Sequence, residues 1–251
     1  MTLSLAEWHH RFQQQARWTR DLRSYIFKHI ELPSSANILE VGSGTGAILT
    51  DSEIPHIKFG LDIDLPSLLF SNHIAPSSIF TCGDGHTLPY SSNAFDLSLC
   101  HFLLLWCNSP AQVLRQMIRV TKPAGFVLAL AEPDYGGRID YPELLSRLGT
   151  EQTMALRQQG ADPLMGRKLA SHFHSAGLQS IESGVIGAQW QSSTTNSEFE
   201  LEWLITNHDL HSFLDSTTLS SLHELEKTSR ENGSRTLFIP TFYAIGRVPP
   251  L

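Results

Sequence analysis

The chain alternates short apolar runs with longer stretches in which apolar residues recur every three or four positions. The short runs occupy residues 37–41, 57–62, 78–81, 95–102 and 126–131. Mostly apolar runs of this length are typical of strands that are buried on both faces of a parallel sheet. Strands that alternate with helices at this spacing predict βαβ units. We therefore predict a doubly wound α/β sheet with helices on both faces.

Helical periodicity fills most of the segments between these strands. Residues 5–31 carry apolar side chains at three- and four-residue intervals without Pro or Gly, which predicts one helix. A second helix is expected to begin after Gly46 and to end before Pro55. Pro66 suits the first turn of a third, and Ser109 precedes a fourth over residues 110–121.

The βαβ rhythm stops after Ala131. Residues 141–159 and 166–176 are predicted to be helical, and a strand is expected over residues 181–188. A polar, helix-prone stretch then precedes a last strand over residues 236–247. These insertions are placed where they would cover the carboxyl edge of the sheet.

Composition narrows the function classes. The chain has 251 residues, 41% hydrophobic and 17% charged, and a formal charge of -7, as expected of one globular domain. Scattered basic residues disfavour a nucleic-acid partner, and Arg17, Arg20 and Arg23 are interpreted as a solvated helix face. No apolar stretch approaches the ~20 residues that span a bilayer, and no signal segment is recognised, so we expect no membrane partner and a cytoplasmic protein. A homodimer stays open.

Cysteine and histidine spacing does not predict a metal site. Cys82, Cys100 and Cys107 form no CxxC pair, and the first two are expected in the core. Two histidine pairs, His9-His10 and His172 with His174, lack a third ligand at useful spacing, so no metal is predicted.

A glycine-rich loop follows the first predicted strand. Ligands of open α/β sheets bind at the carboxyl ends of the strands, where residues 42–46 (Gly-Ser-Gly-Thr-Gly) belong. Glycine permits a tight turn and close approach of a ligand to the backbone. Because Gly42, Gly44 and Ala47 also fit the dinucleotide fingerprint, the loop alone leaves a nicotinamide-dependent oxidoreductase open.

Three acidic residues follow three successive strands. Glu40 ends a strand that is expected to be buried, so it needs a hydrogen-bonding or cationic partner. The ammonium of a bound amino acid would suit it better than a pyrophosphate, and local backbone N–H groups are the alternative. Asp62 lies twenty positions after Gly42, where a carboxylate accepts hydrogen bonds from ribose hydroxyls in either cofactor class. Asp84 could accept from an adenine amino group or serve only as a turn residue.

With these residues in order, the sequence resembles the class I S-adenosylmethionine-dependent methyltransferases, a group that includes the ubiquinone and menaquinone biosynthesis enzymes. The matching segments are residues 38–46, 60–64, 83–89, 95–97 and 119–125. The resemblance implies a Rossmann-like methyltransferase fold of seven mostly parallel strands, the last one antiparallel. It also implies S-adenosyl-L-methionine as cofactor. The implied cofactor-binding residues are Glu40, Gly42, Ser43, Gly44, Gly46, Asp62, Ile63, Gly83, Asp84, Gly85 and His101.

The resemblance divides the predicted single domain, residues 1–251, into three parts. Residues 1–32 are an N-terminal helical lid, residues 37–131 the cofactor-binding half, and residues 132–251 the substrate-side insertions and last strands. Ala124 departs from the family glycine, and we expect a type I turn to accept it.

The implied reaction is in-line methyl transfer to an unidentified small-molecule acceptor. His101 and Asp134 are candidate bases. His101 is more readily interpreted as bonded to cofactor or backbone, and Asp134 could be a base or a turn acid. An apolar lid is expected from Trp8, Phe12, Trp18, Phe102 and Trp106, with Gly136-Gly137 as its hinge; packing of these aromatics in the core is the alternative. A non-catalytic cofactor-binding relative also stays open.

Overall fold

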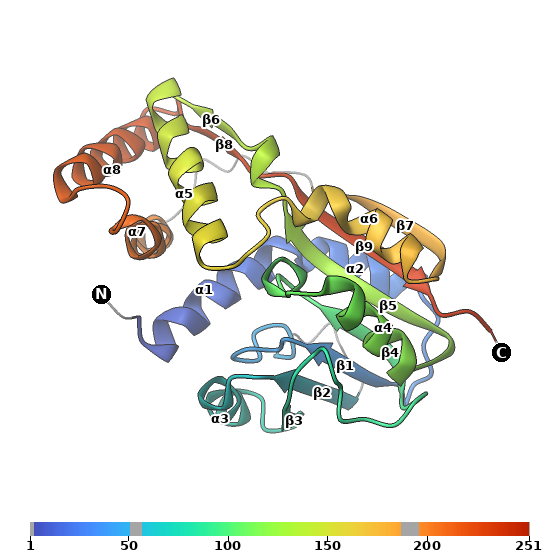
Figure 1. The fold of residues 1–251 in the computed structure, drawn as a ribbon. Helices are drawn as coiled ribbons and strands as arrows, with labels where there is room; N and C mark the ends of the chain where they lie inside the picture. The colour runs from blue at the N-terminus through green and yellow to red at the C-terminus, as the bar shows by residue number, and fades with distance from the viewer. Residues whose placement is uncertain (1–2, 51–56, 187–195, 251) are drawn as a thin grey trace.

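The computed structural model describes residues 3–50, 57–186 and 196–250, and its centre is one seven-stranded sheet (Figure 1). The strand order is β3-β2-β1-β4-β5-β9-β7, and β9 runs antiparallel to both of its neighbours. The strands are β1 (Asn37–Val41), β2 (Ile57–Asp62), β3 (Ile79–Cys82), β4 (Phe95–Cys100), β5 (Thr121–Pro133), β7 (Gln179–Ile186) and β9 (Thr241–Arg247). The order reverses between β1 and β4, which is where such sheets bind ligands. The predicted fold class is confirmed.

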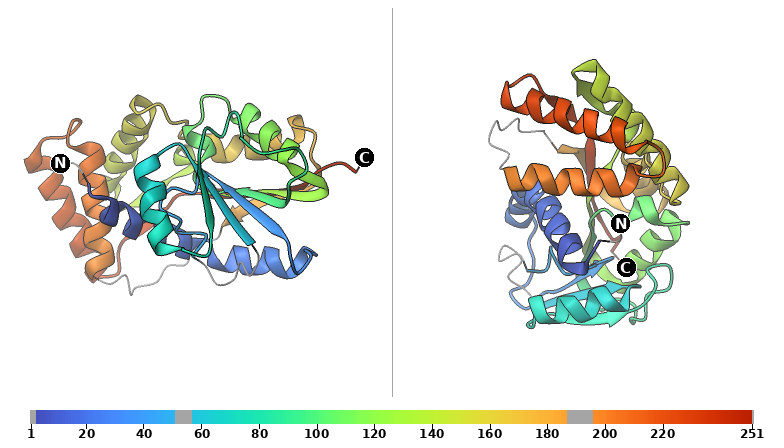
Figure 2. Two further views of the ribbon diagram at one scale, coloured as in Figure 1. Left: turned by 90° about the horizontal axis from the view of Figure 1, so that it is seen from below. Right: turned by 90° about the vertical axis from the view of Figure 1, so that its left-hand side faces the viewer.

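Helices cover both faces of the sheet (Figure 2). They are α1 (Leu5–Trp18), α2 (Arg20–His29), α3 (Leu65–Ile74), α4 (Pro110–Val120), α5 (Ser146–Gln158), α6 (Met165–Ser175), α7 (Asn196–Leu210) and α8 (Ser216–Glu231). Side chains of successive strand residues point to opposite faces, so Leu39 packs into the core beneath α4 and α6, while Ile38 packs with Ile26 of α2. None of the helices in the described ranges is long and apolar enough to cross a membrane.

A helical subdomain, formed by α5, α7, α8 and a two-stranded sheet, has its own core. Its strands are β6 (Ile139–Tyr141) and β8 (Thr236–Phe238). The core residues include Leu148, Phe199, Trp203 and Leu222. Short 3-10 turns link the sheet to these parts: η1 (Leu104–Trp106), η2 (Tyr135–Gly137) and η3 (Glu143–Leu145). Figure 1 places the subdomain beside the N-terminal half of α1.

Buried ion pairs join the two chain segments that build the helical subdomain. Asp140 of β6 accepts hydrogen bonds from Arg138 at 2.6 Å and from Arg235 at 2.8 Å. Arg235 also contacts Glu226 of α8 at 3.1 Å. These four side chains are all at most 8% exposed. Loss of one partner of such a buried ion pair destabilises a protein, because the other charge stays buried without a partner.

Several local predictions differ from the structure. The helix predicted over residues 5–31 is broken at Thr19, whose hydroxyl donates to the Ala16 carbonyl at 3.1 Å and competes with the helical bond. Residues 47–50 form a turn rather than the start of a helix, and the rest of that predicted helix lies outside the described residues. The predicted last strand is two strands, because Pro240 cannot donate to a ladder.

The type I turn expected at Ala124 is instead a bulge inside β5, over residues 122–125. The pairing with β4 jumps from Thr121 opposite Phe95 to Phe126 opposite Leu97. Ala124 has a φ of 61°, in the left-handed region that favours glycine. The expectation that a type I turn accommodates this alanine is therefore wrong, because both central residues of that turn have negative φ.

Candidate functional site

The glycine loop after β1 is tightly turned at the point where the strand order reverses. Gly42, Gly44 and Gly46 have φ values of 75°, 48° and 75°. The amides of Gly42 and Ser43 both donate to the Leu61 carbonyl, at 2.7 and 3.0 Å. A Cβ at Gly42 would lie 2.7 Å from Leu103 Cδ1, so a larger residue does not fit without a shift.

Glu40 is buried beneath this loop. The residue is 2% exposed, and its Oε2 has no hydrogen-bond partner among the described residues. Burial raises the pKa of Glu40 well above its ordinary value; the charge of Arg23 opposes this shift and that of Asp62 adds to it. Ser43 Oγ is a second buried atom without a partner in the described part of the chain. Unpaired buried polar atoms are rare, and two beside one loop indicate a missing polar ligand.

Arg23 is buried near Glu40, which corrects the interpretation of a solvated helix face. Arg17 and Arg20 are exposed, but Arg23 is only 2% exposed. Its Nη1 donates to the Ala16 carbonyl at 2.8 Å and to Thr19 Oγ1 at 2.5 Å. The cation therefore holds the break between α1 and α2.

Asp62 lies at the end of β2 beside the glycine loop. Its Oδ2 accepts from the Gly44 amide at 2.7 Å, and its Oδ1 accepts from the Asp64 amide at 2.9 Å. Ile63, the next residue, is 73% exposed at the rim of the site. Asp62 therefore shapes the loop in addition to its predicted role toward a ribose.

Asp84 lies at the rim after β3, with its side chain 53% exposed. It accepts hydrogen bonds from the backbone amide and from Nδ1 of His86, at 2.8 and 2.7 Å. The hydrogen bond from the backbone amide is the main cause of the lowered pKa of Asp84. Gly83 and Gly85 bring the backbone close to the floor of the site. A Cβ on these glycines would lie 3.2 Å from Leu61 and 3.1 Å from Val41, respectively.

The two predicted bases are both engaged. His101 Nε2 is 3.2 Å from Thr19 Oγ1, and burial, with the nearby Arg23 charge, lowers the pKa of His101 to about 3. A histidine with that pKa is neutral and only weakly basic. Asp134 is 2% exposed, accepts from the Gly136 amide at 2.9 Å and forms a two-pronged ion pair with Arg167.

Helix α1 closes over the glycine loop. His9 Nδ1 is 2.9 Å from Thr45 Oγ1, and the Phe12 ring would lie 3.4 Å from a Cβ at Gly44. Burial lowers the pKa of His9, which favours the neutral ring. Trp8 stacks on Phe12 and meets His208 of α7 edge-on, both with ring centroids 5.8 Å apart. The loop is thus covered by a helix that also contacts the helical subdomain.

Other residues of the predicted lid lie elsewhere or are packed differently. Trp18 and Trp106 are 47% and 45% exposed, so neither is enclosed. Gly136 and Gly137 form the 3-10 turn η2, where a Cβ would lie 2.6 Å from Arg167 and 2.9 Å from Pro240. Close packing, rather than a loose hinge, explains these glycines. Cys82 is exposed, in contrast to its predicted place in the core, whereas Cys100 is buried.

Glu132 is a buried polar residue that the sequence interpretation missed. It is 0% exposed near the end of β5, and its carboxylate accepts from three successive amides, those of Leu103, Leu104 and Leu105. A single acid after an apolar strand was the available signal, the same one that marked Glu40. The predicted strand ended at Ala131, which left Glu132 in a loop.

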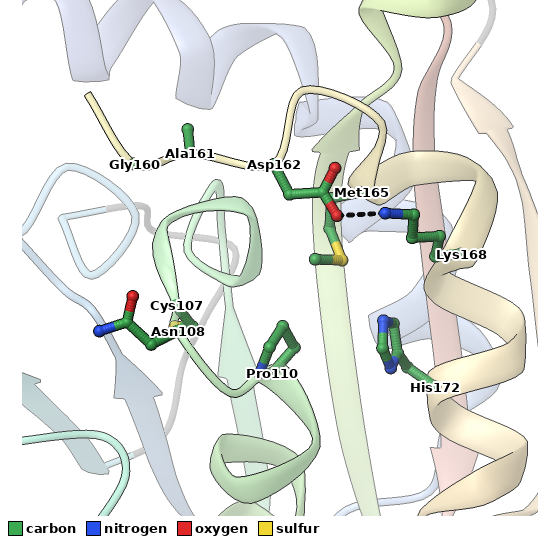
Figure 3. A pocket seen from close by; sticks show the side chains of 9 residues that line it. All are labelled: Cys107, Asn108, Pro110, Gly160, Ala161, Asp162, Met165, Lys168 and His172. Carbon is green, nitrogen blue, oxygen red and sulfur yellow. Dashed lines mark hydrogen bonds and ion pairs between the residues drawn. The ribbon is translucent and has the colours of Figure 1, made fainter. Parts of the chain in front are cut away.

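An open pocket of about 370 Å³ lies beside η1, between the start of α4 and α6 (Figure 3). Its polar lining includes Asn108, His172 and the ion pair between Asp162 and Lys168, at 2.6 Å. The Asp162 amide donates to the Leu105 carbonyl at 2.7 Å, which ties this pocket to the loop after β4.

Comparisons with known proteins agree with the geometry. Residues 39–129 match the model of a family described as a methyltransferase domain. This match and the sheet order agree with the resemblance predicted from the sequence: the matched segment is similar to a methyltransferase domain, and the fold is the predicted Rossmann-like one.

Curated relatives are similar to part of the chain. A demethylmenaquinone methyltransferase of Renibacterium salmoninarum is 34% identical over 137 residues, which are 51% of this chain and 56% of the relative. A malonyl-acyl-carrier-protein O-methyltransferase of a Marinomonas species is 30% identical over 97 residues, 36% of each chain. The chain thus spans about half the length of the curated relatives it matches.

Solved structures extend the likeness in fold to most of the chain. A putative methyltransferase from Bacillus halodurans has a TM-score of 0.59 at 13% identity, covering 90% of this chain and 98% of its own. The 4+2 cyclase SpnF has a TM-score of 0.58 at 17% identity, covering 92% and 81%. At these identities the likeness concerns the fold.

Proposed function

We propose that the protein is an S-adenosylmethionine-dependent methyltransferase that acts on a small molecule. The observation that carries this proposal is the buried, unpartnered Glu40 Oε2 beneath a three-glycine loop at the point where strand order reverses. An ammonium group would supply the hydrogen bonds that this oxygen lacks and would add a positive charge to that of Arg23.

The residues present fit this cofactor. Glu40 and Ser43 would meet its amino-acid end, and the loop from Gly42 to Gly46 would lie along it. Asp62 would bind the ribose and Asp84 the adenine. When bound, S-adenosylmethionine supplies a methyl group already activated on a sulfonium, so the protein has to bind, align and exclude water.

The chain's own contribution is then mainly alignment. Helix α1, through His9 and Phe12, would shield the cofactor loop from water. A neutral His101 would orient groups rather than remove a proton at neutral pH. Asp134, paired with Arg167, would hold the turn after β5 in place. An acceptor that is already nucleophilic, or that loses its proton to solvent, fits this arrangement best.

Further proposals concern location and partners. We infer a cytoplasmic protein that takes a small acceptor and no nucleic acid, and we leave a homodimer open. Relatives named demethylmenaquinone methyltransferase and malonyl-acyl-carrier-protein O-methyltransferase support a small acceptor or acceptor group. Scattered basic residues in a chain of charge -7 support the absence of a nucleic-acid partner.

Calorimetric titration with S-adenosylhomocysteine and with NADH tests the cofactor class. We expect S-adenosylhomocysteine to bind to the wild-type protein and NADH not to bind. Binding of NADH alone would overturn the proposal. Transfer of a labelled methyl group to a metabolite extract then tests the activity, with the Asp62→Ala variant as the negative control.

A further inference from the structure

Glu132 lies at the carboxyl end of β5, next to the loop that follows β4. Its Oε1 accepts from the amides of Leu103 and Leu104 at 3.2 and 2.7 Å, and its Oε2 accepts from the amide of Leu105 at 3.0 Å. The carboxylate therefore binds the first backbone donors of η1, which have no helical partner of their own. One side chain of β5 fixes three successive residues of the neighbouring loop.

That loop forms one wall of the candidate cofactor site. Phe102, at its start, has a φ of 52° and donates its amide to the Ala131 carbonyl at 2.9 Å. Leu103 follows and packs on the glycine loop, so closely that a Cβ at Gly42 would lie 2.7 Å from its Cδ1. A continuous chain of contacts thus leads from Glu132 through Leu103 to Gly42.

The described surroundings of Glu132 offer amide dipoles but no counter-charge. The nearby titratable groups are the thiols of Cys100 and Cys107, whose pKa values are both raised by burial, so both stay neutral. Burial raises the pKa of Glu132 to about 8, although the three hydrogen bonds from backbone amides lower it. An ionised carboxylate accepts these bonds more strongly than the protonated acid does.

We propose that Glu132 is a positioning residue for cofactor binding: its carboxyl group holds the loop after β4, most strongly when it is ionised, so that Leu103 keeps the glycine loop in its binding conformation. This inference rests on the proposed function, since it assumes that the glycine loop binds the cofactor. In the described part of the chain, Glu132 accepts hydrogen bonds from the amides of Leu103 to Leu105 and acts on the glycine loop through Leu103.

The test is calorimetric titration of the intact protein with S-adenosylhomocysteine at about pH 6.5 and about pH 9, on either side of the Glu132 pKa. Glu132→Gln mimics the protonated acid and cannot ionise. At each pH we compare the Kd of this variant with the wild-type Kd, because the ratio cancels the effects of pH on the ligand and on Glu40, which both proteins share. We expect a ratio within about twofold at the lower pH and at least about fivefold at the higher pH, because only the wild-type protein gains the charge.

Two further variants separate positioning from stability. Glu226→Gln alters another buried acid, 6% exposed, in the helical subdomain; it should lower the melting temperature yet keep its Kd ratio constant with pH. Leu103→Ala removes the contact with Gly42. This variant should bind S-adenosylhomocysteine more weakly and should not gain affinity at the higher pH as the wild-type protein does. If Glu132→Gln does not fold, Leu103→Ala still tests the proposal.

The outcomes distinguish the two proposals. A wild-type protein that does not bind S-adenosylhomocysteine would contradict the proposed function. A wild-type protein that binds it, with Kd ratios for Glu132→Gln and Leu103→Ala that do not change with pH, would overturn the role of Glu132.

Discussion

Replacement of Asp62 tests the cofactor site most directly. Its two oxygens accept from the Gly44 and Asp64 amides at 2.7 and 2.9 Å, so Asp62→Ala removes the proposed ribose ligand and loosens the glycine loop. Hydrogen bonds to a charged group are each worth about 1.5–3 kcal/mol. We expect affinity for S-adenosylhomocysteine to fall by at least that amount, about 10- to 150-fold. Asp62→Asn, which keeps one acceptor oxygen for Gly44, should lose less.

Isothermal titration of the folded variants measures this loss. Asp64→Asn is the matched control, because Asp64 caps α3 through the Ser67 amide at 3.0 Å and is not proposed to contact the cofactor. Its affinity should stay within about twofold of the wild-type value, since asparagine keeps an oxygen that can cap α3. Unchanged affinity in a folded Asp62→Ala protein would refute the ribose role.

Three more variants test other features. Ala124→Gly should raise the free energy of unfolding by about 0.5–1 kcal/mol, because glycine adopts the φ of 61° without strain; chemical denaturation would show no gain if the bulge relaxes. Acidification from pH 7 to about 5 should lower the free energy of unfolding by about 1–2 kcal/mol through His101. The pKa of His101 is about 3 in the folded protein, below its unfolded value, so the unfolded chain binds the proton first. His101→Asn should have a weaker acid dependence in denaturation at the two pH values. Phe12→Ala should weaken S-adenosylhomocysteine binding several-fold and should also lower the melting temperature, because Phe12 packs on the core cluster that includes Ile26. Equal affinity in the folded variant would argue against α1 as a lid.

The sheet could be predicted because its strands are short, apolar and separated by glycine or proline. Features set by tertiary contacts could not. Thr19 breaks the first helix where its hydroxyl and Arg23 meet the Ala16 carbonyl, a contact that depends on the bend itself. Burial of Arg23 likewise follows from that bend rather than from helical periodicity. The positive φ of Ala124 follows from the jump in register between β4 and β5.

The candidate site was predictable as far as it lies at strand ends that adjoin glycines. Glu40, Asp62 and Asp84 each follow a short apolar run, and the structure places all three around the glycine loop and its rim. Glu132 ends a strand in the same way but binds amides thirty or so positions away along the chain. Sequence spacing does not predict such a contact. The ion pair between Asp134 and Arg167 could not be predicted for the same reason.

The helical subdomain is assembled from two insertions, one after β5 and one after β7, with α6 and β7 between them. Its core mixes Leu148 from the first insertion with Trp203 from the second, and the Asp140–Arg235 pair spans both. Neither insertion can therefore be exchanged alone: a chimera carrying one foreign insertion would inherit half a core and an orphaned buried charge. New acceptor specificity on this scaffold would require the two segments to be replaced, or to change, together.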